Sequence, residues 1–230
     1  SYRIPPADAV VNPKQPDCPY PFKSLCGAAV AFKLIQVLYE ELGFSEEEAL
    51  IYLENAAFAT VGDVMELQGE NRILVKEGIK ALHQTKNYGI RALAARNQIP
   101  LNSIKSYHIG FVLGPCLNAS GRLDTAKRAL NMLLAENEYQ AAEYAGDLYD
   151  LNASRKEMTE QGVQQAKELV EHTELKKDKV LVIYLPQCHE SLAGIVAGRI
   201  REQYHRPVFV LTKSEEGVKG SGRSIEQYSM

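Results

Sequence analysis

The sequence predicts an α/β protein in which a mostly helical first part is joined by one long helix to a smaller part built on a βαβ unit. Apolar residues recur at helical spacing as far as residue 136. Residues 138–171 contain no proline and few apolar side chains, which suits either one long solvated helix that bridges two domains or two helices broken at Gly146 or Gly162. Two β-branched apolar runs then flank an amphipathic stretch. The expected domains are 1–137, a connecting helix 138–172, and 173–230.

The composition is that of an ordinary globular protein, with 45% hydrophobic and 24% charged residues. No apolar run approaches the roughly 20 residues that a membrane helix needs, and SYRIPPADAV lacks the basic start and apolar middle of a signal peptide. We therefore expect a cytoplasmic chain with no membrane contact. The four cysteines are scattered and form no zinc motif, so we expect reduced thiols, three of them buried.

The charge distribution argues against nucleic-acid binding through bulk positive charge, because the formal net charge is -3. The average conceals a gradient along the chain. Residues 40–70 carry nine acids and no lysine or arginine, whereas residues 199–223 carry six bases against three acids. A polyanion would therefore bind the C-terminal part.

The first part opens with a loop at residues 10–22 that contains four prolines. A core helix is expected at about residues 25–41, stopping at Gly43. Its apolar face consists of Val30, Leu34, Ile35, Val37 and Leu38. Ser45 and Glu48 form a capping box that begins a second helix.

Two further helices are expected over NRILVKEGIKALHQ and NYGIRALAARNQI. The short segment TVGDVMEL before them places Asp63 on a loop or at a helix end. After them, the run IGFVLGP, residues 109–115, is expected to be buried and extended. GPCLNASGRLD, residues 114–124, is expected to be a loop that leads into another helix.

The expected βαβ unit consists of KVLVIYLP, HESLAGIVAGRIREQY and PVFVLT. Its strands should be parallel and neighbouring or nearly so, because a right-handed crossover through the helix joins them. His189 and Glu190 would then follow the first strand at the start of the helix, where anions bind favourably. His189 could donate to a phosphate there, or it could be a helix cap.

Two glycine-containing stretches could also bind a phosphate. In GPCLNASGRLD, Asn118 and Arg122 could point into such a site, or the segment could supply only turns and a cap. In KGSGRS, residues 219–224, every side chain is a hydrogen-bond donor and the glycines let the backbone approach a ligand. The alternative is an exposed hairpin or strand end. Asp63 alone cannot hold a divalent metal, which needs about six ligands.

Taken together, these segments resemble the RecJ family of single-strand-specific 5'-to-3' DNA exonucleases, in the DHH phosphoesterase superfamily. NPKQPDCPYPFKSLCGAAVAFKL is similar to the stretch after the DHH motif, ATVGDVMELQGENRILV to the fourth motif and GPCLNASGRLD to the fifth. HESLAGIVAGRI and KGSGRSI are similar to two motifs of the DHH-associated domain. The resemblance implies that 1–137 is the C-terminal portion of a DHH catalytic domain and 173–230 the N-terminal portion of the associated domain.

The resemblance also implies a role for each candidate residue. Asp63 would be one ligand of a centre with two Mn²⁺ or Mg²⁺ ions. Asn118 and Arg122 would contact the scissile phosphate, with Arg122 offsetting transition-state charge and His189 lying nearby. The residues expected to bind the phosphate at the 5' end are Gly220, Ser221, Gly222 and Arg223. The implied partners are single-stranded DNA with a 5' end and DNA-repair proteins, in DNA recombination and repair.

Several family motifs do not occur in this chain: the DxD motif, a second lone aspartate, the DHH triplet, and a later GGHxxAAG segment. We therefore expect an internal fragment of a larger enzyme. Without partner ligands Asp63 cannot assemble a two-metal centre, so the isolated chain is expected to lack metal-dependent nuclease activity. Weak, salt-sensitive DNA binding centred on Arg223 is expected instead.

Two other functions remain open from the sequence. One is a DHH-family oligoribonuclease or cyclic-dinucleotide phosphodiesterase, which shares the metal aspartate and a glycine-rich terminal motif. The segments CPYPFKSLCG and LNASGRLD look more like the exonuclease. The other is a non-catalytic module in which the glycine-rich loops bind a phosphate or a nucleotide.

Overall fold

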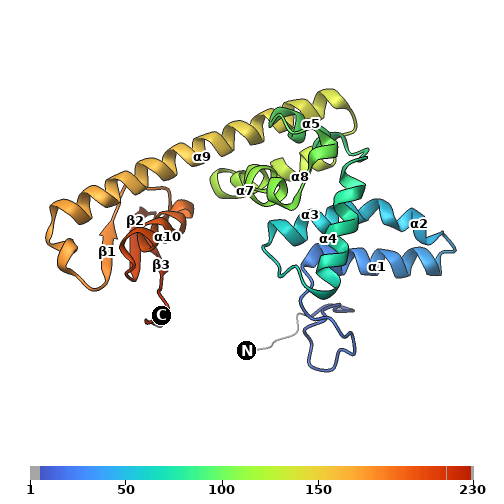
Figure 1. Cartoon of the computed structure of the whole chain (residues 1–230), viewed down its shortest axis with the longest axis horizontal. Coiled ribbons are helices and arrows are strands. Elements are labelled where there is room, and N and C mark those ends of the chain that lie inside the picture. Colours follow the sequence, from blue (N-terminus) through green and yellow to red (C-terminus); the bar gives the residue numbers. More distant parts are fainter. Residues whose placement is uncertain (1–5, 216, 229–230) are drawn as a thin grey trace. The chain divides into compact units, whose positions relative to one another are not determined.

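The computed structural model describes residues 6–215 and 217–228, and it divides the chain into two compact units (Figure 1). The first unit is the chain up to Leu117 together with Leu130–Gly146, and the second is Asn118–Ala129 together with the chain from Asp147 onward. The first is helical and the second holds a sheet, so the predicted α/β class is confirmed. The first half of SYRIPPADAV lies outside the described residues.

Short helices build the first unit. In chain order they are α1 Gly27–Glu41, α2 Glu46–Ala49, η1 Leu50–Tyr52, α3 Leu53–Gly62, α4 Gly69–Leu82, α5 Tyr88–Arg96, η2 Leu101–Ser103, α6 Ser106–His108 and η3 Ile109–Leu113. Two more helices contribute residues to both units, namely α7 Gly114–Leu123 and α8 Lys127–Leu133. The predicted capping box is confirmed, since the Ser45 N–H donates to the Glu48 carboxylate at 2.9 Å.

Helix α1 forms where the sequence predicts it, and Val30 packs against the core, but most of its predicted apolar face does not. Ala29 and Phe32 are the buried residues of this helix. Leu34, Val37 and Leu38 are each at least half exposed, at 54%, 56% and 50%. The prediction of a core-facing surface there is therefore wrong. Periodicity identifies which face of a helix is apolar, but the packing of its neighbours decides which face is covered.

A series of hydrogen bonds connects α3, the start of α5 and the end of α8 within the first unit. The Thr85 hydroxyl donates to Glu54 Oε1 at 2.8 Å and accepts from the Asn87 N–H at 3.1 Å. The Asn87 side chain then caps α5 by accepting from the Ile90 N–H, and it donates to the Leu133 carbonyl at 2.9 Å. Burial raises the pKa of the Glu54 carboxyl, and the Thr85 hydrogen bond opposes that shift only in part.

Residues 109–123 differ most from the sequence prediction, because the run expected to be extended is a π turn, η3, and the expected loop is helix α7. In a regular α-helix Pro115 could not donate to the Phe111 carbonyl, and its ring would clash with that group. The wider π turn directly precedes Pro115 and accommodates it. A Cβ on Gly114 would lie 2.6 Å from the Ile109 carbonyl oxygen, so glycine is needed where this turn closes. The Gly-Pro pair therefore reshapes the helix instead of ending it.

The second unit contains a three-stranded mixed sheet in the order β1-β2-β3 (Figure 1). The strands are β1 Leu181–Tyr184, β2 Val208–Ser214 and β3 Gly217–Arg223. The predicted parallel pairing is confirmed, with Leu181 opposite Val208, whereas β3 runs antiparallel to β2 and places Ser221 opposite Val210. The helices of this unit are α9 Glu138–His172, which begins in the first unit, η4 Glu174–Lys177, η5 Glu190–Leu192 and α10 Ala193–Tyr204.

Two helices cover one face of this sheet. The buried cluster combines side chains of α9, α10, β1 and β2, namely Val163, Ala166, Val170, Leu181, Ile183, Leu185, Ala193, Val196, Ala197, Ile200, Val208 and Val210. On the opposite face Val182 and Tyr184 are 49% and 48% exposed. One face of β1 is therefore packed, and the other is partly open to solvent.

Of the two predicted alternatives, the structure has one long helix, α9 with 35 residues, and not two helices broken at Gly146 or Gly162. It contributes residues to both units, and the boundaries of 1–137, 138–172 and 173–230 stay a prediction. In the described ranges no helix is both long enough and apolar enough to cross a membrane.

All four cysteines are free thiols, as expected. Cys26 and Cys116 are buried, whereas Cys18 and Cys188 are only half-buried, so two thiols are in the core instead of the predicted three. Partial burial raises the pKa of the Cys188 thiol, which keeps it protonated at neutral pH.

Candidate functional site

A tight turn after β1 positions the first candidate residue, His189. Its Nδ1 atom accepts from the Ser191 N–H at 3.3 Å and lies 2.8 Å from the Ser191 hydroxyl, and His189 is the N-cap of η5. Since Nδ1 accepts a backbone hydrogen bond, the ring hydrogen of the neutral imidazole is on Nε2. The interpretation of His189 as a cap is confirmed, and the same bonds prepare Nε2–H to act as a donor.

Arg122 joins this turn from a distant part of the sequence. Its Nη1 atom donates to the Ser191 carbonyl at 3.2 Å, across 69 residues of chain. Asn118 lies one turn earlier on α7 and is exposed, as is Arg122. Residues four apart share a face of an α-helix, so α7 presents an amide and a guanidinium together. Both residues belong to the second unit, as does His189.

Strand β3 brings the third candidate stretch to the start of α10. The Arg223 guanidinium donates to the Ser221 hydroxyl at 3.0 Å and to the Gly222 carbonyl at 2.6 Å. A Cβ on Gly194, in the first turn of α10, would lie 2.6 Å from Arg223 Nη2 and 2.9 Å from Ser221 Oγ. Lys219 also pairs with Glu190 of η5 at 3.0 Å. The KGSGRS stretch is therefore a strand whose polar side chains meet a helix N-terminus.

Gly220 and Gly222 lie on β3 between the polar side chains. A Cβ on Gly220 would lie 2.5 Å from Leu211 Cδ2 and 3.0 Å from the Val210 carbonyl oxygen. Gly220 is therefore needed for the close approach of β2 and β3. The roles of Gly220 and Gly222 in ligand binding stay predictions.

The chemistry of this cluster suits an anion. Arg122 and Arg223 are permanently cationic, Ser221 and the His189 imidazole can donate, and α10 begins at the same place. The exposed N–H groups and the dipole of a helix N-terminus favour negative charge. Arginine can hold two phosphate oxygens with parallel hydrogen bonds. This edge of the second unit can therefore orient a phosphate.

Asp63 belongs to the first unit, as the residue that ends α3. Its N–H bonds to the Ala59 carbonyl at 2.8 Å, and the chain turns sharply at Val64, whose φ is 55°. The prediction of a helix end is confirmed. In the part of the chain that the structure describes, no three His, Cys, Asp or Glu residues lie together as metal ligands.

Sequence reasoning missed Ser191 and Gly194. Ser191 links His189 to Arg122 through its backbone and its hydroxyl, and Gly194 makes room for Arg223. Ser191 lies two residues after His189 at a predicted helix start, which is a signal for a cap. The partner of its carbonyl, 69 residues away, has no signature in the sequence.

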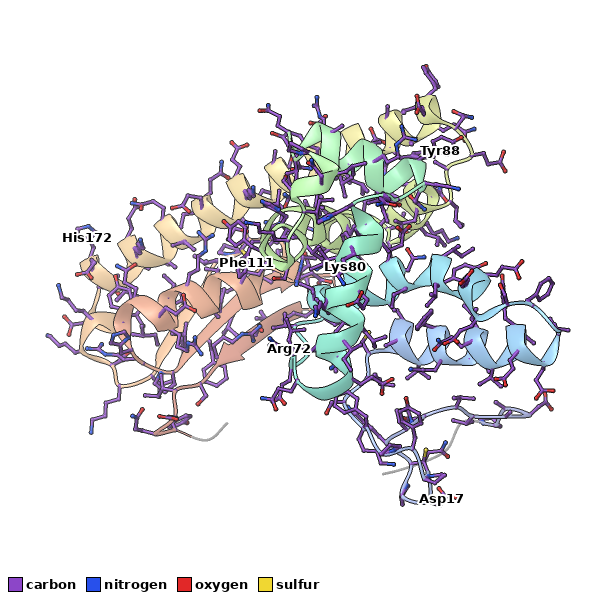
Figure 2. The ribbon with its side chains drawn as sticks, turned by 45° about the vertical axis from the view of Figure 1, so that its right-hand side comes forward. Asp17, Arg72, Lys80, Tyr88, Phe111 and His172 are labelled. Atoms are coloured by element: carbon purple, nitrogen blue, oxygen red, sulfur yellow. The ribbon has the colours of Figure 1, made fainter. Side chains whose placement is uncertain are left out.

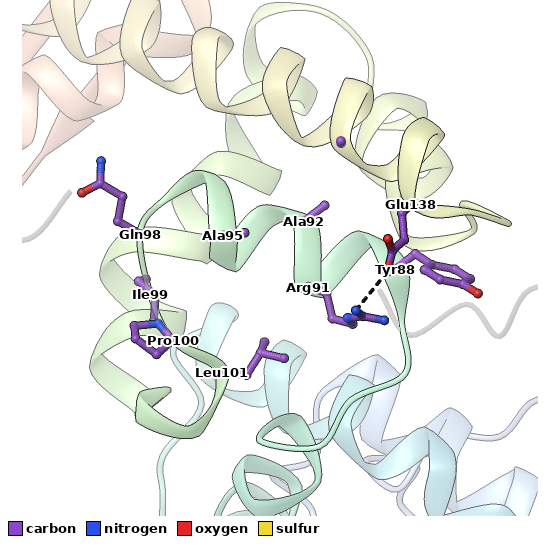
Figure 3. Close-up of a pocket in the computed structure, with 10 residues that line it drawn as sticks. Tyr88, Arg91, Ala92, Ala95, Gln98, Ile99, Pro100, Leu101 and Glu138 are labelled. Atoms are coloured by element: carbon purple, nitrogen blue, oxygen red, sulfur yellow. Dashed lines mark hydrogen bonds and ion pairs between the residues drawn. The ribbon is translucent and has the colours of Figure 1, made fainter.

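The first unit also contains a cavity of about 530 Å³ that the sequence does not indicate (Figure 3). It is lined by Tyr88, Arg91, Ala92, Ala95, Gln98, Ile99, Pro100, Leu101, Glu138 and Ala142. Arg91 pairs with Glu138 at 3.0 Å and lies 6.0 Å from the centre of the Tyr88 ring. These two charges neutralise each other, so the cavity lacks the net positive charge that favours phosphate binding.

The chain consists of a helical unit, one long helix and an α/β unit, and solved structures of exonucleases contain a similar fold. The structure of exonuclease RecJ bound to manganese superposes with a TM-score of 0.81 at 34% identity, covering 99% of this chain and 55% of that one. RecJ from Thermus thermophilus in complex with Mg²⁺ gives 0.77 at 35% identity, covering 91% of this chain and 32% of that one.

Curated sequences give the same result, although no family model matches the chain. It is 39% identical to the single-stranded-DNA-specific exonuclease RecJ of Dickeya dadantii, over 96% of this chain and 41% of that protein. Identity to Escherichia coli RecJ is 37%, over 99% of this chain and 42% of that protein. The chain thus spans about two fifths of the length of these relatives. Over the segment that it covers, the chain is similar to RecJ in both sequence and fold.

Proposed function

We propose that the chain forms the phosphate-orienting part of a metal-dependent exonuclease that degrades single-stranded DNA from the 5' end. The observation that carries the proposal is the contact network of the second unit. It gathers residues of three predicted motifs, with Arg122 bonded to the turn of His189 and with Ser221 and Arg223 against the start of α10. The relatives favour the exonuclease over the dinucleotide phosphodiesterase and the non-catalytic module.

Asn118 and Arg122 hold the scissile phosphate in this proposal. The Arg122 guanidinium offsets the negative charge that builds up on the phosphoryl oxygens, and it is preorganised by its bond to the Ser191 carbonyl. His189 donates from Nε2 to the same phosphate, because Nδ1 is occupied by Ser191. These groups bind and orient the substrate.

The 5' end of the strand binds at β3. Arg223 and Ser221 take the terminal phosphate, with Gly220 and Gly222 between them on the strand. A cytoplasmic location and DNA-repair partners belong to the same proposal, as do the domain limits 1–137, 138–172 and 173–230.

Asp63 is proposed as one ligand of a centre with two Mn²⁺ or Mg²⁺ ions, since related RecJ structures are in complex with these metals. The described residues do not fit a complete metal site, because Asp63 has no ligand cluster around it and one carboxylate cannot hold two ions. We therefore expect that the isolated chain binds DNA but does not hydrolyse it. Manganese-dependent release of nucleotides by the purified chain would contradict this expectation.

Fluorescence anisotropy with a labelled, 5'-phosphorylated single strand tests the phosphate site. Replacing Arg223 by alanine should weaken binding and reduce the slope of log K against log salt by about 0.7, the value for one lost phosphate contact on a single strand. Arg199→Ala is the matched control, because Arg199 is an exposed arginine of α10 that pairs with Glu160 at 2.9 Å. Equal affinity and equal slope for the parent and Arg223→Ala would refute the assignment.

A further inference from the structure

Two exposed aromatic rings are stacked on the surface of the first unit. The ring centroids of Tyr107 and Phe111 lie 5.2 Å apart and their planes differ by 28°. The two residues are 61% and 71% exposed, and Phe111 is labelled in Figure 2. His108 lies edge-on to Tyr107, with centroids 5.9 Å apart. Each ring covers one face of the other, so the outer faces remain available to a ligand.

The backbone fixes this orientation. Tyr107 and Phe111 are four residues apart across α6 and the π turn η3, while the aliphatic residues Ile109 and Leu113 of the same turn are 0% and 1% exposed. The buried side chains anchor the turn, and the large side chains that it leaves exposed are the two aromatic rings. π turns are rare in proteins and occur frequently at functional sites.

The turn η3, which carries Phe111, packs against the helix α3 that ends at Asp63. Gly110, between the two rings in sequence, packs against α3, since a Cβ there would be 3.6 Å from Val61 Cγ1. Val61 precedes Asp63 by two residues in the last turn of that helix. A DNA strand whose phosphate lies at Asp63 therefore has its neighbouring bases within reach of this surface. Lys105, which is exposed just before Tyr107, supplies a positive charge for the backbone of the strand.

We propose that Tyr107 and Phe111 form a base-stacking platform for single-stranded DNA, an inference that rests on the proposed function. Flat, exposed ring faces suit nucleobases, because every base has a π face and stacking needs no hydrogen-bond match. Among the aliphatic side chains of η3, Ile109 and Leu113 are buried and Val112 is half-buried, so the two rings are the main exposed apolar surface of this turn. The platform holds bases of any sequence next to the phosphate that Asp63 approaches.

The test compares binding of the purified chain to a labelled oligothymidylate and to an abasic strand of equal length. Both strands carry the same phosphates, so the ratio of the two affinities reports the bases alone. The parent should bind the base-bearing strand about tenfold more tightly. Phe111→Ala and Tyr107→Ala should move this ratio toward one without changing the salt slope, because no phosphate contact is lost.

Two further variants separate stacking from general apolar contact. Phe111→Leu keeps an apolar side chain but removes the ring, and should lose the preference, whereas Phe111→Tyr should retain it. The control is Tyr139→Ala, which removes a ring that is 81% exposed in the same unit. Melting temperatures confirm that each variant folds. If the alanine variants do not fold, Phe111→Leu and Phe111→Tyr still show whether the base preference depends on an aromatic ring.

The inference is overturned if the parent shows no preference for the base-bearing strand, or if Phe111→Leu retains the parental ratio. The second result would indicate an apolar docking surface for protein. Failure of the phosphate site is read separately, from the salt slope of Arg223→Ala. If the ring variants lose the preference for the base-bearing strand while Arg223→Ala keeps the parental salt slope, the platform is supported and the proposed phosphate site is contradicted.

Discussion

Substitution of Gly194 by alanine tests the contact between α10 and β3 from the helix side. The added Cβ would lie 2.6 Å from Arg223 Nη2, 2.9 Å from Ser221 Oγ and 3.4 Å from Arg223 Cζ. Because non-bonded heavy atoms are most stable at about 3.5–4.0 Å, the guanidinium must withdraw by about 1 Å. The atoms that move are the ends of flexible side chains, so the fold should be retained.

The expected loss is in anion affinity. A hydrogen bond to a charged group contributes about 1.5–3 kcal/mol, so displacing Arg223 should weaken binding of a 5'-phosphorylated dinucleotide by roughly 10- to 100-fold. Calorimetric titration with the phosphorylated and the 5'-hydroxyl dinucleotide isolates the terminal phosphate. Thermal melting should show no destabilisation, because alanine is favoured over glycine in a helix by about 0.8–1.0 kcal/mol.

Gly198→Ala is the matched control for this experiment. Gly198 lies on the same helix, one turn later, and nothing lies within 4 Å of a Cβ added there. This variant should gain the same helix propensity and bind the phosphate normally. If Gly194→Ala bound the phosphorylated dinucleotide as tightly as Gly198→Ala, the proposed phosphate site at this contact would be wrong.

Two further predictions concern the stability of the first unit. Burial raises the pKa of Glu54, so the folded state binds a proton more tightly than the unfolded state, and the free energy of unfolding should fall as pH rises above the usual carboxyl range. Glu54→Gln keeps an acceptor for Thr85, and urea titrations across pH should show that this fall is removed. If the free energy of unfolding of both proteins changed with pH by the same slope, the predicted direction of the Glu54 effect would be contradicted. Gly78→Ala places a Cβ against Ala57, where α3 and α4 pack closely, and should cost about 1–3 kcal/mol in the same titrations. A midpoint equal to that of the parent would show that the two helices can separate without cost.

The sequence predicts regular elements well where local signals agree. The capping box at Ser45, the long helix α9 and the parallel β1-β2 pair all follow from patterns of neighbouring residues. The structure of residues 109–123 does not follow from such local patterns, because a Gly-Pro pair after an apolar run is typical of a strand followed by a loop. Here a π turn carries the helix across Pro115, and that outcome depends on the packing of Ile109 and Leu113 in the core.

In the candidate site too, features that depend on neighbouring residues could be predicted from the sequence, whereas contacts that depend on tertiary packing could not. The motif residues could be found from their order in the chain, and His189 from its place after a predicted strand. The hydrogen bond from Arg122 to the Ser191 carbonyl could not be predicted, because it depends on tertiary packing within the second unit. The role of Gly194 has the same origin, since only the register of β3 places Arg223 against it.

The most direct test of the central claim is the activity of a chimera. In it, this chain replaces the matching segment of Thermus thermophilus RecJ. The measurement is manganese-dependent release of nucleotides from 5'-phosphorylated single-stranded DNA, for chimeras that melt cooperatively. The account predicts that the chimera digests the strand and that its Asp63→Asn variant does not. A folded chimera whose Asp63→Asn variant digests the strand at an undiminished rate would contradict it.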